Sequence, residues 1–231
     1  NVTRGAYSTI GGGGGAAPFD SNSAQGAYSV IGGGIRNTSL GSFSFVGGGY
    51  ENLAIDSGCT VSGGRNNKAR GKYSVVNGGG GTFPADSNSA GPWATVSGGR
   101  GNDATGSYSA IGGGSSNLAS AFGATIAGGS DNVADTNYAT VGGGYFNNAM
   151  GYISTVAGGN FNTASDWYST VGGGTSNQAT GSQSTVGGGS NNLADTTYTT
   201  VGGGFQNSAS GYSATVGGGR SNMAHQHTST V

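Results

Sequence analysis

A single branched aliphatic residue followed by glycines returns along the whole chain at a nearly constant interval. Twelve of the fourteen intervals are 15 residues, and the two exceptions, of 21 and 20 residues, end at Ile31 and Val96. A fixed period of this kind is the signature of a repeat architecture. The aliphatic residues are Ile10, Ile31, Val46, Val61, Val76, Val96, Ile111, Ile126, Val141, Val156, Val171, Val186, Val201, Val216 and Val231.

The residues just before each aliphatic position alternate as in a β-strand. In the repeat that contains Tyr168–Val171, Ser169 and Val171 would share one face, and Tyr168 and Thr170 would share the other. The column that contains Ser169 always holds a small residue, whereas the tyrosine column is interrupted by glycine or short polar residues. Gaps of that kind in a packed core would leave costly voids, so we expect the Val face inside and the Tyr/Thr face outside.

An Asn-x-Ala segment should form the opposite wall of each repeat. Asparagine and alanine are two residues apart and would both point inward, the alanine toward the aliphatic column. The asparagines would form a ladder whose amides bond from coil to coil and to the turn backbone. Paired glycines, such as Gly173 and Gly174, would form the bend between the walls. The ladder asparagines are Asn37, Asn52, Asn67, Asn102, Asn117, Asn132, Asn147, Asn162, Asn177, Asn192, Asn207 and Asn222.

Fifteen residues cannot fold alone, but they can form one coil of a stacked solenoid. The sequence therefore predicts an all-β fold, a parallel β-solenoid or β-roll of about fifteen 15-residue coils with two short strands per coil. Residues 1–231 would form a single domain. The two long intervals carry related inserts, near 12–24 and 80–91, which we expect to be loops at one edge of the stack.

Composition narrows the possible functions. The chain has 53 glycines, 7% charged residues and a formal net charge of −1, so it carries no electrostatic footprint for nucleic acid. It has no apolar run long enough to insert into a membrane. Because the chain starts within a repeat and stops on an aliphatic position, we expect it to be a segment of something longer.

The Gly-Gly-Gly-x-x-Asn-x-Ala rhythm resembles the head repeats of YadA-like trimeric autotransporter adhesins and related Gly-rich bacterial surface and tail-fibre repeats. The resemblance covers almost the whole chain. The 15-residue coil and the paired glycines of this chain differ from the pattern of those head repeats. It implies an extracellular or cell-surface fibre that is oligomeric, a trimer or filament, and that adheres or supports.

The outward columns should carry any interaction. Stacked at one coil spacing, the aromatic residues would form a stripe, and large exposed apolar patches usually meet a partner. A sister chain is the first candidate and a glycan or another surface the second, while rings that merely stack on one another are the alternative. The stripe comprises Tyr28, Phe43, Tyr73, Trp93, Tyr108, Tyr138, Tyr168 and Tyr198 with Thr125, Thr140, Thr155, Thr170, Thr185 and Thr200.

The ranked threonines also suggest an alternative function, because threonine rows on flat solenoid faces are typical of ice-binding proteins. Against it, the alternate position is usually aromatic and would roughen the plane. Threonine is also simply a good strand former.

No catalytic residue, cofactor site or metal site is predicted. The segment Gly98–Asp103 is similar to a calcium-binding repeat, but the period of this chain differs and aspartate does not recur in register. Asp20 and Asp86 lie in Asp-Ser-Asn runs that are typical of turns. His225 and His227 lack a third ligand nearby. Cys59 replaces a serine or alanine in a small column. A catalytic centre would break the repeat at a unique place, so we expect no enzyme.

Overall fold

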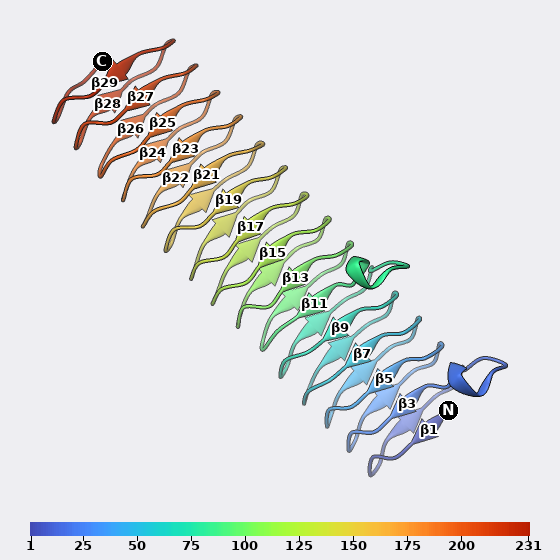
Figure 1. Ribbon diagram of the computed structural model, residues 1–231. Helices are drawn as coiled ribbons and strands as arrows, with labels where there is room; N and C mark the ends of the chain where they lie inside the picture. The colour runs from blue at the N-terminus through green and yellow to red at the C-terminus, as the bar shows by residue number, and fades with distance from the viewer. The chain divides into compact units, whose positions relative to one another are not determined.

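The computed structural model consists of two-residue β-strands joined by turns, together with two short 3-10 helices (Figure 1). It describes residues 1–231 apart from the side chain of Pro18. The chain divides into two compact units, Asn1–Asn117 and Leu118–Val231. Each unit is a parallel β-solenoid with two strands per coil, which confirms the predicted fold.

In the N-terminal unit, odd-numbered strands form one parallel sheet and even-numbered strands form the other. The odd-numbered strands are β1 (Val2–Thr3), β3 (Ser23–Ala24), β5 (Thr38–Ser39), β7 (Leu53–Ala54), β9 (Lys68–Ala69), β11 (Ser89–Ala90) and β13 (Asp103–Ala104). The even-numbered strands are β2 (Thr9–Ile10), β4 (Val30–Ile31), β6 (Phe45–Val46), β8 (Thr60–Val61), β10 (Val75–Val76), β12 (Thr95–Val96) and β14 (Ala110–Ile111).

The C-terminal unit has the same arrangement. Its odd-numbered strands are β15 (Leu118–Ala119), β17 (Val133–Ala134), β19 (Asn148–Ala149), β21 (Thr163–Ala164), β23 (Gln178–Ala179), β25 (Leu193–Ala194), β27 (Ser208–Ala209) and β29 (Met223–Ala224). Its even-numbered strands are β16 (Thr125–Ile126), β18 (Thr140–Val141), β20 (Thr155–Val156), β22 (Thr170–Val171), β24 (Thr185–Val186), β26 (Thr200–Val201) and β28 (Thr215–Val216).

The core between the two sheets is thin and made of small residues. Val171, Ser169 and Ala179 are fully buried, as the alternation predicts. Equivalent residues of successive coils pair directly, Val156 with Val171 in one sheet and Ala164 with Ala179 in the other. Each inward column therefore stacks on itself along a unit, and residues of similar size recur at every level.

Two kinds of turn close each coil. We call the turn that follows each odd-numbered strand the aromatic edge, for example 165–168 after β21. We call the turn that follows each even-numbered strand the glycine edge, for example 172–176 after β22. In the latter, Gly174 has a φ of +86°, a conformation that favours glycine.

The strand before each aliphatic residue is shorter than the sequence predicts. Tyr168 has a φ of +57° and lies in the turn, so the strand begins only at Thr170. A left-handed residue cannot continue an extended strand, and the expected four-residue strand Tyr168–Val171 was therefore wrong in length. Tyr168 nevertheless lies outside the core, and Thr170 is half-buried.

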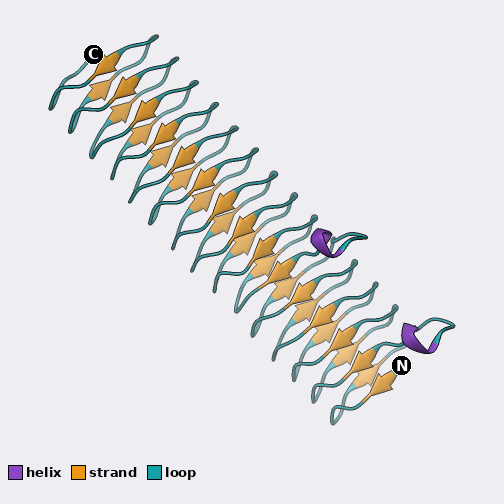
Figure 2. Ribbon diagram, viewed as in Figure 1, coloured by secondary structure: helices purple, strands orange, loops and turns teal.

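Both inserts lie at the glycine edge of the N-terminal unit. Figure 2 shows that each contains a short helix, which projects beyond the neighbouring turns. The helices are η1 (Pro18–Asp20) and η2 (Pro84–Asp86). The inserts are shorter than the predicted 12–24 and 80–91, because Ser23–Ala24 and Ser89–Ala90 already belong to strands β3 and β11.

Candidate interaction surface

The aromatic edge holds its tyrosines at a fixed corner of each coil. The Tyr168 N–H donates to the Tyr152 carbonyl of the preceding coil (2.9 Å), and the Ser169 N–H donates to the Asp166 carbonyl (3.1 Å). Tyr28, Tyr73 and the equivalent tyrosines share the left-handed φ of Tyr168. Non-glycine residues adopt this region rarely, so each turn is held there by its hydrogen bonds to the neighbouring coil.

In the N-terminal unit the rings stack face to face. The ring centroids of Tyr7, Tyr28 and Phe43 are separated by 5.0 and 5.1 Å, with interplanar angles of 14° and 2°. After a gap at Gly58 the stack resumes, with Tyr73 and Trp93 at a centroid distance of 6.4 Å and an angle of 28°, and Trp93 and Tyr108 at 5.2 Å and 6°. Because the ring faces cover one another, these stacks present mainly ring edges to the outside.

In the C-terminal unit the tyrosine and phenylalanine rings of this edge meet edge to face instead. Tyr138 contacts Phe122 at 5.5 Å and 77°, and Tyr152 contacts Tyr138 at 6.2 Å and 81° and Tyr168 at 5.9 Å and 89°. Phe122 and Tyr152 stand one residue before the tyrosine column of their coils. The aromatic edge of this unit therefore zigzags between two columns.

The glycines that interrupt the tyrosine column make room for a neighbouring ring. A Cβ at Gly58 would lie 2.5 Å from the Tyr73 ring, and a Cβ at Gly123 would lie 2.9 Å from the Tyr138 ring. These two interruptions are thus filled from the next coil. All eight predicted aromatic residues of the stripe are exposed, with fractions between 45% and 68%.

The threonines of the stripe lie on a sheet, next to the aromatic edge. Thr125, Thr140, Thr155, Thr170, Thr185 and Thr200 each begin an even-numbered strand and are half-buried. They pair directly along the sheet, as Thr140 with Thr155 and Thr155 with Thr170. The predicted stripe thus spans two surfaces, because the aromatic residues occupy a turn and the threonines occupy a sheet face.

The ladder asparagines form hydrogen bonds to the glycine turns and to one another. The Asn162 side chain donates to the carbonyls of Gly158 (2.9 Å) and Gly174 (2.9 Å), and its Oδ1 accepts the Asn177 N–H (2.9 Å). One amide thus joins its own glycine turn to the next coil and the next ladder residue. Of the twelve predicted asparagines, Asn222 is half-buried and the rest are fully buried.

The sequence prediction missed three members of the ladder: Asn1, Asn22 and Asn88. The Asn22 N–H and amide donate to the Asn1 Oδ1 (3.1 and 3.2 Å), and the Asn102 N–H donates to the Asn88 Oδ1 (3.0 Å). The Asn-Ser-Ala triplet that ends each insert carries the same Asn-x-Ala pattern as the regular coils. That triplet was the signal available to detect Asn22 and Asn88.

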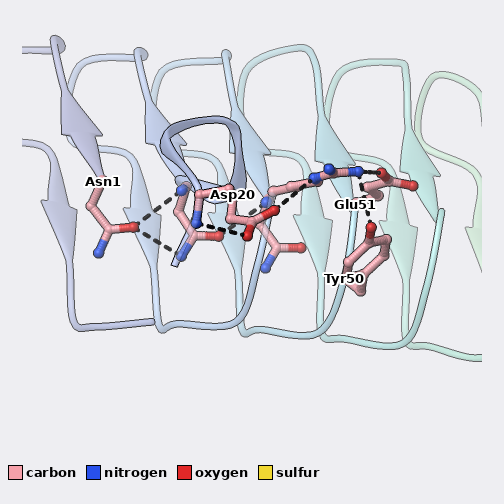
Figure 3. A network of polar contacts seen from close by, with 8 residues as sticks. Asn1, Asp20, Tyr50 and Glu51 are labelled. Carbon is pink, nitrogen blue, oxygen red and sulfur yellow. Dashed lines mark hydrogen bonds and ion pairs between the residues drawn. The ribbon is translucent and has the colours of Figure 1, made fainter. Parts of the chain in front are cut away.

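A cluster of charged and polar side chains connects the first insert to the glycine edge, as Figure 3 shows for Asp20, Tyr50 and Glu51. The Arg36 guanidinium forms ion pairs with Asp20 (3.3 Å) and Glu51 (2.7 Å) and donates to the Tyr50 hydroxyl (3.0 Å). The hydrogen bond to Glu51 raises the pKa of Arg36. In the second insert, Asp86 approaches Arg100 at a longer 3.8 Å.

The glycine edge also carries aromatic residues that sequence reasoning missed. Phe146 and Phe161 stack at 5.5 Å, and Tyr145 meets both of them edge to face. Arg65 lies over the Tyr50 ring and Arg220 over the Phe205 ring. These residues occupy variable columns, so no periodic signal marked them.

The residues considered for chemistry stand apart from one another. His225 hydrogen-bonds Ser210, His227 stacks on Tyr212, and the buried Cys59 thiol donates to the Gly71 carbonyl. Burial raises the pKa of Asp103, against the opposing charge of Arg70. Within the described residues, no three His, Cys, Asp or Glu side chains gather as metal ligands.

No protein-family model matches the chain, and no curated protein matches its sequence. Among the described residues, no helix is both long enough and apolar enough to cross a membrane.

Proposed function

We propose that this chain is a structural and adhesive module of an extracellular fibre or surface filament, which self-associates through its aromatic edge and the adjoining threonines. The observation that carries the proposal is the row of exposed rings along the aromatic edge of each unit, which is interrupted at Gly58 and at Gln183. Isolated exposed aromatic residues are ordinary on a protein surface, whereas a long row of them is typical of a surface that meets a partner.

The chemistry of the row supports a protein partner. Aromatic side chains supply large contact area at low conformational entropy cost, and they are enriched in protein interfaces. The resemblance to adhesin head repeats supports the same assignment and the extracellular location.

The test replaces the aromatic edge of the C-terminal unit by the triple substitution Tyr138→Ser, Tyr168→Ser and Tyr198→Ser. Serine is compatible with this corner, because Ser213 already occupies it with a φ of +56°. We expect the parent chain to sediment as an oligomer and the variant to sediment as a monomer.

A matched control lies on the opposite turn of the same unit. Phe146→Ser, Phe161→Ser and Phe205→Ser remove three rings whose exposed fractions, 42%, 50% and 37%, are close to those of the three tyrosines, 48%, 45% and 46%. This control should remain oligomeric. A parent chain that sediments as a monomer would refute self-association, and equal dissociation of both variants would refute the assignment to the aromatic edge.

Ice binding is a second candidate, and it rests on the unbroken threonine column of the C-terminal unit. Every even-numbered strand from β16 to β28 begins with threonine, and the strands are in register at the ~4.8 Å spacing of a sheet. Such a row would offer hydroxyl and methyl groups at a regular interval.

Thermal-hysteresis measurements test the second candidate. If the threonine row binds ice, the parent chain should depress the freezing point, and Thr155→Tyr with Thr185→Tyr should abolish the effect. Absence of hysteresis in the parent chain at high protein concentration would end this hypothesis.

A further inference from the structure

The two units differ in the charge that they place on the aromatic edge. In the N-terminal unit this edge carries Arg4, Arg70 and Lys72 against one carboxylate, Asp56, a net charge of +2. In the C-terminal unit it carries Asp135, Asp166 and Asp195 and no lysine or arginine, a net charge of −3 with neutral histidines. The surface that the proposed function assigns to self-association is therefore basic in one unit and acidic in the other.

These charges are available for a partner. Arg4, Arg70, Lys72, Asp135 and Asp195 are exposed. Within the described residues, the salt bridges of the chain belong to Arg36 and Arg100, both at the glycine edge. Arg70 acts on Asp103 through its charge without forming an ion pair with it.

The basic pair and the acidic pair of charges also have the same spacing along the solenoid. Arg4 and Arg70 follow the ladder residues Asn1 and Asn67 by three positions, and Asp135 and Asp195 follow Asn132 and Asn192 by three positions. Both pairs therefore occupy the same corner of the coil. Four coil steps separate the two residues of each pair, on the order of 19 Å at the usual strand spacing.

An in-register parallel assembly would place like charges at the same level. Arg70 and Lys72 of one copy would then lie beside the same cations of the next, and such juxtapositions disfavour a complex. Pairing the basic edge with the acidic edge instead sets opposite charges together, and the equal four-coil spacings let two contacts form at once.

We propose that two copies of this chain associate with the N-terminal aromatic edge of one against the C-terminal aromatic edge of the other. Arg4 and Arg70 of one copy face the Asp195 and Asp135 carboxylates of the second, and the tyrosine rows between these charges form the apolar part of the contact. This inference rests on the proposed self-association and specifies its partner surface.

Charge reversal tests the pairing. The basic-edge variant carries Arg70→Glu and Lys72→Glu, and the acidic-edge variant carries Asp135→Lys and Asp195→Lys; Asp166 is left intact because its Oδ1 accepts the Trp167 N–H of the turn. Measured by sedimentation in low salt, the dissociation constant of each variant alone should rise at least about tenfold above that of the parent chain. An equimolar mixture should recover association close to the parent level.

A matched control reverses two cations on the glycine edge, Arg65→Glu and Arg220→Glu, with the same change in net charge. It should associate as the parent chain does. Association of the parent should also weaken between 0.05 and 0.5 M NaCl, because salt shortens the Debye length from about 14 Å to about 4 Å.

The outcomes separate the two proposals. If the serine variants of the tyrosines dissociate but the charge-reversed chains associate normally, self-association stands and the pairing of opposite edges fails. Failure of the mixture to recover association also overturns the pairing. A parent chain that is monomeric in low salt overturns both.

Discussion

The aromatic edges of the two units have the same backbone conformation but differ in the packing of their rings and in the charge of the neighbouring side chains. In the N-terminal unit, Tyr7, Tyr28 and Phe43 stack with nearly parallel planes beside basic residues. In the C-terminal unit, Tyr138, Tyr152 and their neighbours meet edge to face beside carboxylates. The corner is held in both by the same left-handed conformation.

Beneath these edges the inward columns hardly change. Every described ladder asparagine bonds to the turn or to its neighbouring coil, and alanine or serine faces the aliphatic column in both units. The frame and the surface of the solenoid are therefore specified by separate columns. Substitutions in the frame should therefore cost the same in both units, whereas substitutions on the edges should not.

The largest expected effect comes from the glycine at the third position after the aliphatic residue. Gly64 and Gly159 have φ values of +86° and +87°, and a Cβ there would lie 2.2 and 2.1 Å from the carbonyl oxygen of the next coil. Gly64→Ala and Gly159→Ala should each lower the free energy of unfolding by about 3 kcal/mol or more, through left-handed strain and the collision. Urea denaturation followed by circular dichroism measures the loss.

Adjacent glycines supply the control. Gly63 and Gly158 lack the left-handed φ, and a Cβ at Gly63 would contact nothing within 4 Å. Gly63→Ala and Gly158→Ala should therefore change stability by less than about 1 kcal/mol. Equal losses at both positions of a turn would contradict the geometric explanation.

The ladder gives the next largest effect. The Asn52 amide donates to Gly48 and Gly64 at 2.8 and 2.9 Å, and the Asn147 amide donates to Gly143 and Gly159 at 2.8 and 2.7 Å. Asn52→Ala removes the partner of the Gly48 carbonyl and of the buried Asn67 N–H, and Asn147→Ala removes the partner of the Gly143 carbonyl and of the buried Asn162 N–H, at ~1–3 kcal/mol per group. We expect losses of about 3 kcal/mol in both units by the same urea measurement.

The neighbouring Asn148 points outward from β19 and is only half-buried. Asn148→Ala should stay within about 0.5 kcal/mol of the parent chain, as surface substitutions usually do. A much larger loss at Asn52 than at Asn147 would break the claim that the two units share one frame.

The sequence predicted this frame well and the edges poorly. Val171, Ser169 and the ladder asparagines repeat because each stacks on its own copy, so periodicity alone reveals their inward direction. Periodicity could not reveal that Tyr168 is left-handed, because tyrosine has no intrinsic preference for that conformation and the hydrogen bond to Tyr152 imposes it. The Arg36 cluster was also beyond prediction, since it depends on contacts between variable columns.

Removing one stacked ring should lower the free energy of unfolding more than removing one edge-to-face ring. Tyr28 is covered on both faces, by Tyr7 and Phe43, whereas Tyr168 meets a single ring, Tyr152, at its edge. With about 0.5–1.5 kcal/mol for each aromatic pair, Tyr28→Ser should cost about 2 kcal/mol and Tyr168→Ser about 1 kcal/mol. Urea denaturation at a concentration where the chain is dissociated keeps association out of the measurement. Equal losses would mean that ring contacts within the chain do not distinguish the two edges.

The smallest expected effect concerns the outward column of the odd-numbered strands, where the N-terminal unit has Asp103 and the C-terminal unit has Asn148 at the equivalent position. Burial raises the pKa of Asp103, and the charges of Arg70 and Lys68 only partly oppose it. Asp103→Asn replaces the carboxylate by the side chain that the other unit already carries there.

The raised pKa of Asp103 determines whether Asp103→Asn stabilises or destabilises the fold at a given pH. The folded state holds the proton more tightly than the unfolded chain, so the carboxyl favours folding below its unfolded pKa of about 3.9, and this contribution is lost as the pH rises through the folded-state pKa. At pH 7 Asp103→Asn should therefore raise the free energy of unfolding, by on the order of 0.5 kcal/mol, the size typical of surface changes. At pH 3 the variant and the parent should unfold at nearly the same urea concentration. A loss of stability at pH 7 would show instead that attraction between Asp103 and the nearby cations outweighs its burial.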